Sequence, residues 1–290
     1  MKLDTSTLAS RGAMLLFVLL WGSAAIFTRW GLDHGSPFAL LIVRFCIALG
    51  VLLLIIGLTR HNWLPAQGTR WQVAATGLLL IGSYSICYFQ AMAFGITPGL
   101  IATLLGIQPI LTLLLIERRF SPLRLVGLMV ALCGLILVVY QSLVVSQFAL
   151  IGMAFALGAL VCMTTGAILQ KQTNQAPPQV LPLQYAVSLV ACLLFAPFQP
   201  IELEFSLGFL GPVIWLGLVV SVVAQLLLYR MIRSGNLVNV TSLFYLVPVV
   251  TAVMDYVFLG NLLPLQSIGG MLAILAGLAL VFRNPPIATP

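Results

Sequence analysis

Residues 106–137 read GIQPILTLLLIERRFSPLRLVGLMVALCGLIL, and this stretch decides the fold class. It covers most of two apolar runs, 98–116 and 123–141, which a short charged segment and Pro122 separate. An apolar helix of about 20 residues crosses the hydrocarbon core of a bilayer. We therefore expect two membrane-spanning helices here, joined by a short turn.

The rest of the chain has the same character. Its 290 residues are 61% hydrophobic and only 7% charged, whereas soluble domains are about 45–50% apolar and about 25% charged. This composition excludes a soluble enzyme, a disordered chain and a small secreted domain held by disulfides. Glycine, proline and polar breaks divide the sequence into ten predicted spans: 12–30, 37–58, 71–94, 98–116, 123–141, 148–169, 180–198, 207–229, 237–259 and 264–282.

The distribution of positive charge indicates the orientation. If the N-terminus is cytoplasmic, the cytoplasmic segments hold eleven of the thirteen Lys and Arg residues: Lys2, Arg11, Arg60, Arg70, Arg118, Arg119, Arg124, Lys171, Arg230, Arg233 and Arg283. Lys and Arg in short loops are retained on the cytoplasmic side. We expect a multi-pass plasma-membrane protein with both termini cytoplasmic, and the short loops point to a bacterial inner membrane. Because the net charge of +7 is dispersed and forms no patch, no nucleic-acid partner is expected.

The two halves of the sequence resemble each other at an offset of 139 to 142 residues. The matches are Pro37 with Pro177, Arg44 with Gln184, Pro109 with Pro248, Thr112 with Thr251, Pro122 with Pro264, Gly127 with Gly269 and Ala131 with Ala273. Five spans in each half is an odd number, so the second half must enter the membrane from the opposite side. Inverted repeats of this kind are typical of secondary transporters. We predict one repeat over residues 1–142 and a second over residues 148–284.

Several motifs in this order carry a family resemblance. They are Leu20-Trp21-Gly22-Ser23, Arg44-Phe45 followed by Ala48, Gln108-Pro109, Val247-Pro248, and the glycines of the fifth and tenth spans. The chain resembles the drug/metabolite transporter superfamily, specifically the EamA-type permeases with two five-helix repeats. The resemblance implies an all-α membrane protein with ten helices around a central cavity and the export of amino acids or other small metabolites. Gly260-Asn261 departs from the Gly-Glu that such proteins often carry, so no role is transferred to this turn.

Two ionisable residues stand out inside the predicted spans. Arg44 lies in the second span and Asp255 near the outer end of the ninth. Ionisable groups within a membrane are costly and therefore mark functional candidates. Asp255 is a candidate for proton coupling or for binding a substrate amine. The alternatives are a structural ion pair between Arg44 and Asp255 and, for Asp255, exposure at the outer interface.

A larger set of polar, aromatic and proline residues is expected to line a substrate cavity. Pro248 lies on a polar stripe of the ninth span, Pro109 occupies the matching position in the fourth, and proline frees a backbone carbonyl that needs another partner. The eighth span carries Ser221, Gln225 and Tyr229 at four-residue spacing. Kinks that serve only packing, and hydrogen bonds between helices, are the structural alternatives. The candidate cavity residues are Trp21, Thr28, Tyr84, Tyr88, Pro109, Thr112, Thr164, Gln225, Tyr245, Pro248 and Thr251.

The fifth and tenth spans carry small residues in place of polar ones. Gly127, Ala131 and Gly134 in the fifth are matched by Gly269, Ala273 and Gly277 in the tenth. Such stripes allow helices to approach closely, so we expect a scaffold, with a homodimer face as a further use. The five cysteines all lie in apolar runs without metal-binding spacing, so we expect no metal, disulfide or cofactor.

We therefore predict a secondary-active exporter of a small amphipathic metabolite, with amino acids or related compounds as the first candidates. A flippase for lipids or lipid-linked sugars, or a broad drug exporter of the same fold, is the alternative within transport. The sequence lacks a phosphate-binding Gly-x-x-x-x-Gly-Lys loop. A membrane-embedded enzyme would need clustered Asp, His or Lys at the bilayer surface, and the sequence has no such cluster, so we expect no enzymatic activity.

Overall fold

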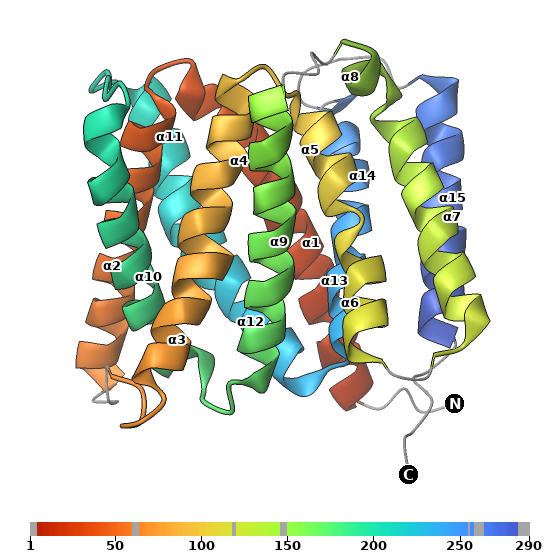
Figure 1. Cartoon of the computed structure of the whole chain (residues 1–290), viewed down its shortest axis with the longest axis horizontal. Helices are drawn as coiled ribbons and strands as arrows, with labels where there is room; N and C mark the ends of the chain where they lie inside the picture. Colours follow the sequence, from red (N-terminus) through yellow and green to blue (C-terminus); the bar gives the residue numbers. More distant parts are fainter. Residues whose placement is uncertain are drawn as a thin grey trace. The chain divides into compact units, whose positions relative to one another are not determined.

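Figure 1 shows the computed structural model, which describes residues 5–59, 64–117, 120–145, 150–254, 256–257 and 264–283. In these residues the structure is helical apart from turns and one isolated bridge between Gly35 and Leu203. Nine helical segments of the described part are long and apolar enough to cross a membrane, and Pro122–Val138 is a shorter apolar helix. The chain is a multi-pass membrane protein.

The described residues form fifteen α-helices. They are α1 (Thr5–Leu32), α2 (Pro37–Thr59), α3 (Arg70–Gly77), α4 (Tyr84–Ala93), α5 (Pro98–Leu105), α6 (Gln108–Ile116), α7 (Pro122–Val138), α8 (Tyr140–Val145), α9 (Leu150–Gln172), α10 (Pro177–Phe195), α11 (Leu207–Ile214), α12 (Gln225–Ser234), α13 (Leu237–Ser242), α14 (Leu246–Met254) and α15 (Leu265–Arg283). The shorter helices are pieces of interrupted spans and connections between spans.

Within the part of the chain that the structure describes, four spans change their helical geometry. In the third, the π-helical segment η1 (Leu78–Ser83) joins α3 to α4, and in the eighth, η3 (Trp215–Ala224) joins α11 to α12. The fourth span is broken between α5 and α6, and the ninth passes through the 3₁₀ turn η4 (Leu243–Tyr245). Helix breaks therefore lie close to both prolines that the sequence singled out, Pro109 and Pro248.

The chain divides into two compact units, and each unit draws on both halves of the sequence. Unit 1 comprises the described residues of Met1–Ser83 and Leu169–Ser234. Unit 2 comprises those of Tyr84–Ile168 and Gly235–Pro290. The predicted sequence repeat is a different kind of division, and it stays a prediction.

In unit 1, α10 packs against α2, α3 and η1, and η3 packs against α1 and α2. Phe45 on α2 meets Tyr185 on α10 edge to face, with ring centroids 5.6 Å apart. Two glycines allow close approach, because a Cβ atom on Gly77 would collide with the backbone of Gln184, and one on Gly217 would collide with Ile47. The core of this unit therefore lies where the two π-helical segments meet α2 and α10.

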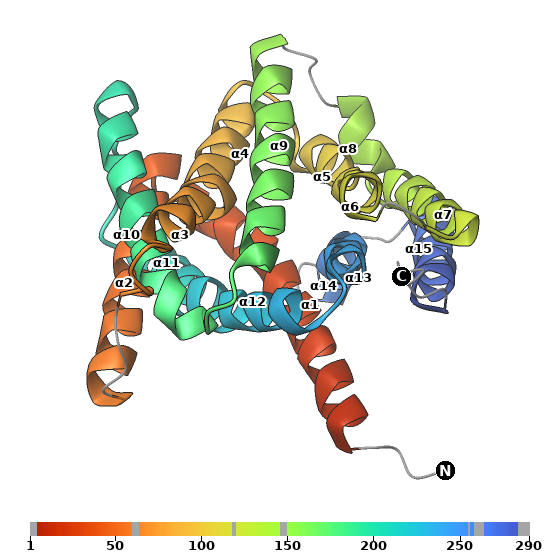
Figure 2. The ribbon, with the colours of Figure 1, turned by 60° about the horizontal axis from the view of Figure 1, so that its bottom comes forward.

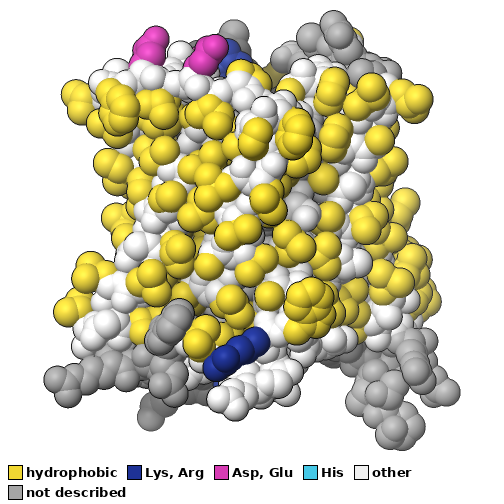
Figure 3. Space-filling view, turned by 60° about the vertical axis from the view of Figure 1, so that its left-hand side comes forward, with side chains coloured by type: hydrophobic (Ala, Val, Ile, Leu, Met, Phe, Trp, Pro, Cys, Tyr) yellow, Lys and Arg dark blue, Asp and Glu magenta, His cyan; other side chains and the backbone are white. Residues whose placement is uncertain are grey.

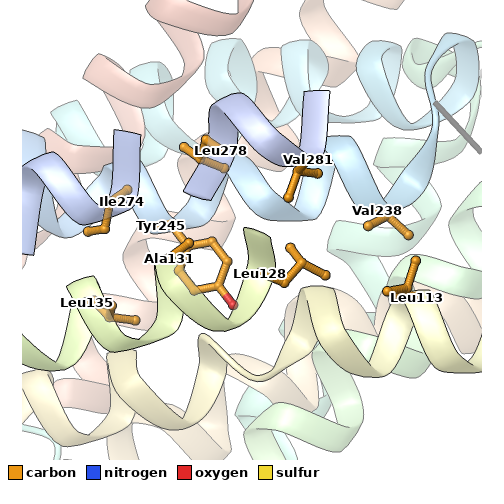
Figure 4. Close-up of a cluster of buried hydrophobic side chains, with 9 residues drawn as sticks. All are labelled: Leu113, Leu128, Ala131, Leu135, Val238, Tyr245, Ile274, Leu278 and Val281. Carbon is orange, nitrogen blue, oxygen red and sulfur yellow. The ribbon is translucent and has the colours of Figure 1, made fainter. Parts of the chain in front are cut away.

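In unit 2, α7 and α15 lie side by side, as Figures 1 and 2 both show. Gly127 and Gly134 face the backbone of Gly277 and Gly270, so the predicted small-residue stripes pack against each other within one chain. A Cβ atom on Gly269, which the sequence placed in this stripe, would meet no atom within 4 Å, and Gly270 takes its place. Figure 4 shows the adjoining apolar cluster, formed by Leu113, Leu128, Ala131, Leu135, Val238, Tyr245, Ile274, Leu278 and Val281.

The outer faces of the helices are apolar. Figure 3 shows hydrophobic side chains over the sides of the helices, with acidic side chains confined to one end of the visible face. Leu58, Leu194 and Leu272 expose 77%, 72% and 63% of their surfaces. A soluble monomer rarely exposes such contiguous apolar area, so these faces are suited to contact with lipid.

Candidate functional site

The breaks in the fourth and ninth spans meet inside unit 2. Pro109 has no N–H, so the backbone carbonyl four residues earlier loses its helical partner, and the chain turns at Gly106. The hydroxyl of Tyr245, at the break of the ninth span, donates a hydrogen bond to the carbonyl of Gly106. Tyr245 is fully buried, so the two interrupted helices are tied together in the interior of the unit.

Beside this link lies a buried amide with unused hydrogen-bonding capacity. Gln108 is 1% exposed, and its Nε2 finds no partner among the described residues. Thr112, one turn later, donates to the Gln108 carbonyl at 2.8 Å. A buried donor without an acceptor costs free energy, so Gln108 is suited to bind a polar group of a ligand or a water molecule. Sequence analysis used Gln108 only as part of a family motif.

The other residues of the polar stripe on the ninth span differ in burial and in hydrogen bonding. Thr241 is buried and donates to carbonyls of its own helix, Leu237 at 3.0 Å and Val238 at 3.1 Å, so its hydroxyl is already engaged. Pro248 and Thr251 are half-buried on α14. Asp255 lies outside the described residues, and its two predicted roles therefore remain predictions.

The aromatic and hydroxyl candidates of the third and sixth spans also belong to unit 2. Tyr84 and Tyr88 lie on α4 with ring centroids 6.0 Å apart, and Tyr88 meets Phe89 edge to face. Thr164 on α9 is 2% exposed, and its hydroxyl has no partner among the described residues. Unit 2 thus contains an aromatic face and buried polar atoms, as expected of a site for a small amphipathic molecule.

Arg44 forms a separate polar cluster inside unit 1. Its Nε donates to the Ser221 hydroxyl at 2.7 Å, and the Tyr185 hydroxyl donates to the Ser221 carbonyl at 2.6 Å. Ser221 belongs to η3, and a π-helical segment leaves backbone carbonyls that need outside partners. Sequence analysis identified Arg44 and Ser221 but missed Tyr185, because a tyrosine within an apolar run carries no distinguishing signal.

Further buried polar groups extend this cluster within unit 1. Gln184, the repeat match of Arg44, is fully buried and donates through Nε2 to Gln170 at 2.9 Å. Its Oε1, and the hydroxyl of the equally buried Tyr229, have no partner among the described residues. Gln225 is 6% exposed and lies four residues after Ser221 and four before Tyr229. Both predicted residues of the first span, Trp21 and Thr28, are half-buried on α1 in this unit.

A buried ion pair in unit 2 escaped sequence analysis. Arg124 is fully buried, and its Nη1 donates to both carboxylate oxygens of Glu117, at 2.7 and 2.6 Å. Its Nη2 donates to Asn239 at 2.9 Å and to Asn236 at 3.1 Å, and Asn236 in turn donates to Glu117 at 2.9 Å. The sequence analysis counts Arg124 only among the positive charges of the cytoplasmic segments. The sequence pattern that could have predicted this ion pair is a Glu and an Arg on the two sides of one short turn, in a chain that has few charges.

Comparison with known proteins identifies relatives along the whole chain. The sequence matches the EamA-like transporter family twice, over residues 11–140 and over residues 150–283. It is 24% identical over 284 residues to the "Uncharacterized transporter YvbV" of Bacillus subtilis (strain 168), covering 94% of this chain and 92% of that protein. It is 23% identical over 284 residues to the "Probable amino-acid metabolite efflux pump" of Salmonella typhimurium, covering 91% of each chain.

Two further comparisons concern one half of the chain and the fold. A segment of 133 residues is 31% identical to the "Uncharacterized inner membrane transporter YedA" of Escherichia coli (strain K12), covering 43% of this chain and 42% of that protein. A solved crystal structure with 18% sequence identity has a TM-score of 0.80 and covers 95% of this chain and 98% of its own. This last likeness concerns the fold alone.

Proposed function

Since the chain belongs to the EamA-like transporter family, we propose that it is a secondary-active exporter of amino acids or related small amphipathic metabolites. It would work by alternating access, exposing one central site to each side of the membrane in turn. The relatives named above are transporters, and the Salmonella typhimurium protein is named for amino-acid metabolite efflux.

The meeting of two broken spans in unit 2 is the observation that carries this proposal. Interrupted helices at the middle of a membrane form the substrate sites of many secondary transporters. Here the fourth and ninth spans are interrupted, Tyr245 binds Gly106 at the break, and the Gln108 amide lies buried without a protein acceptor among the described residues. A substrate that offers an oxygen acceptor would satisfy this amide.

The proposed architecture is ten spans in two inverted five-helix repeats, over residues 1–142 and 148–284, with both termini in the bacterial cytoplasm. Matched positions support the repeat. Gly106 and Tyr245 are 139 residues apart, and the two π-helical segments occupy equivalent places in the third and eighth spans. Gly77 packs on Gln184, whereas Gly217, 140 residues later, packs on Ile47 and the Arg44 carbonyl.

Counterflow transport tests the substrate class. Purified protein is reconstituted into liposomes loaded with unlabelled amino acids, and the uptake of a labelled panel is measured. Saturable uptake of a few amino acids is the expected result, and Trp21→Ala and Tyr88→Ala are expected to raise KM. If folded protein exchanges no amino acid, the proposal fails, and lipid-linked or xenobiotic substrates take its place.

The proton-coupling role of Asp255 needs its own measurement. If this carboxylate exchanges protons during transport, a pH gradient across the liposome drives flux in the native chain, and Asp255→Asn abolishes that dependence while counterflow persists. A flux that ignores the pH gradient and is unchanged in Asp255→Asn contradicts the coupling role without affecting the transport proposal.

A further inference from the structure

Two cysteines from distant parts of the sequence meet inside unit 2. Cys87 lies on α4 and Cys162 on α9, and the Sγ atom of Cys87 lies beside Gly158, one turn before Cys162 on α9. The two helices lie side by side in Figures 1 and 2. Both residues are half-buried, so the pair is neither sealed in the core nor fully open. The sequence alone predicts no metal site or disulfide at these cysteines.

The packing of α4 on α9 sets the position of the Cys87 sulfur. Gly158 lies one turn before Cys162, and a Cβ atom there would stand 3.4 Å from the Sγ of Cys87. The sulfur of Cys87 therefore lies against the stretch of α9 that runs from Gly158 to Cys162. A larger side chain at position 158 would take the space that the sulfur occupies.

The number of available ligands limits what such a site can hold. Among the residues that the structure describes, no group of three or more His, Cys, Asp or Glu side chains could hold a metal ion. Zinc in closed protein sites takes four ligands, so a two-sulfur site does not suit it. Soft cations prefer thiolate sulfur, and those of the d¹⁰ type accept two ligands in a linear arrangement.

We propose that Cys87 and Cys162 form a two-sulfur binding site for soft, two-coordinate cations, with Hg(II) as the probe. Binding breaks two S–H bonds, forms two Hg–S bonds and releases two protons to the solvent, with no change in oxidation state. The product carries no net charge, which matters because a charge inside a membrane span is costly. Occupation of the site joins α4 to α9 through the metal.

The experiment measures Hg(II) retention by the full-length chain in detergent against a competing monothiol. The background variant carries Cys46→Ala, Cys133→Ala and Cys192→Ala, so that only the proposed pair remains. Native mass spectrometry is expected to find one Hg(II) per chain. Cys87→Ser or Cys162→Ser in this background is expected to weaken retention about 100-fold, because the second sulfur binds at a high effective concentration. Equal retention by the pair and by the single cysteines overturns the proposal.

Two further variants distinguish the loss of the Hg(II) site from a general loss of folding. In the native chain, Cys46→Ser removes an exposed thiol of unit 1 and is expected to leave the tightly held Hg(II) in place, whereas Cys87→Ser is expected to lose it. Gly158→Leu keeps both cysteines but displaces the Cys87 sulfur, so it is expected to lose the tight site while both thiols still react with maleimide. Tight binding that survives Gly158→Leu contradicts the geometry proposed here. None of these readouts depends on transport.

Discussion

Arg124 shows how a charge can be held in the interior of this protein. Its guanidinium is fully buried and binds both oxygens of Glu117, while Asn236 and Asn239 accept its other hydrogen bonds. Removal of one partner from a buried ion pair leaves the other charge uncompensated, which costs about 3–5 kcal/mol. The pair also joins the end of α6 to the first turns of α7 and α13.

Arg124→Ala is therefore expected to lower the free energy of unfolding by about 3–5 kcal/mol. The measurement is the loss of monodisperse protein on heating in detergent. Arg230→Ala, at an exposed arginine on α12, is the matched control and is expected to change stability by less than about 0.5 kcal/mol. If the two variants melt together, the buried network does not stabilise unit 2.

Substitution of Gln108 is expected to weaken substrate binding without lowering stability, in contrast to substitution of Arg124. Because its Nε2 has no acceptor among the described residues, Gln108→Leu is expected to preserve thermal stability. If the amide binds substrate, the same variant should raise KM in counterflow about 3- to 10-fold, which corresponds to a hydrogen bond of about 1 kcal/mol. Thr241→Val is the control, since this buried hydroxyl donates to its own helix. An unchanged KM in Gln108→Leu places the substrate elsewhere.

At the level of the element, hydropathy alone was sufficient to predict the nine membrane-length helices of the described residues, because each apolar run must become a helix that satisfies its own backbone. Pro109 and Pro248 also predicted the breaks in the fourth and ninth spans. The π-helical segments had no local signal, since they depend on packing between distant helices. The same reason explains why Tyr185, Gln108 and the cysteine pair were missed as functional candidates.

Tyr185→Phe tests the packing around η3. The substitution keeps the edge-to-face contact with Phe45 but removes the donor to the Ser221 carbonyl. A buried carbonyl left without its partner costs about 1–3 kcal/mol, so the thermal transition is expected to fall by a corresponding amount. Tyr140→Phe, at a tyrosine that is 48% exposed, is expected to have no effect. No difference between the two variants would mean that water replaces the Tyr185 hydroxyl.

Two adjacent glycines on α15 provide a matched test of its packing against α7. Gly270→Ala would press a methyl group against the backbone of Gly134, and such overpacking typically costs about 1–3 kcal/mol. Gly269→Ala points into open space and is expected to be neutral or slightly stabilising, because alanine is the better helix former. Thermal melting in detergent separates the two cases, and equal destabilisation would contradict the α7–α15 contact.

At the level of the whole molecule, repeats in sequence and units in space do not coincide. Unit 1 takes its residues from Met1–Ser83 and Leu169–Ser234, and unit 2 from the remainder. The predicted homodimer through the fifth and tenth spans stays a prediction. It would have to use faces such as those of Leu123 and Leu272, because the small residues already pack within the chain.

The interleaved units predict the behaviour of half-chains. Residues 1–142 expressed alone hold only part of each unit and are expected to be degraded. Co-expression with residues 143–290 is expected to restore a complex that survives detergent extraction, because both units can then be completed. Stable, monodisperse protein from the first half alone would contradict this interpretation of the units.

The pairing of α7 with α15 has a consequence for the order of synthesis. A ribosome that has just finished residue 138 has produced α7 with its glycines and backbone uncovered, and the partner helix follows only at residues 265–283. Until then, α7 must remain inserted without its closest neighbour, in contact with lipid, with a chaperone or with the insertion machinery. A ribosome that stalls before residue 265 would leave unit 2 without α15, the helix that packs along α7.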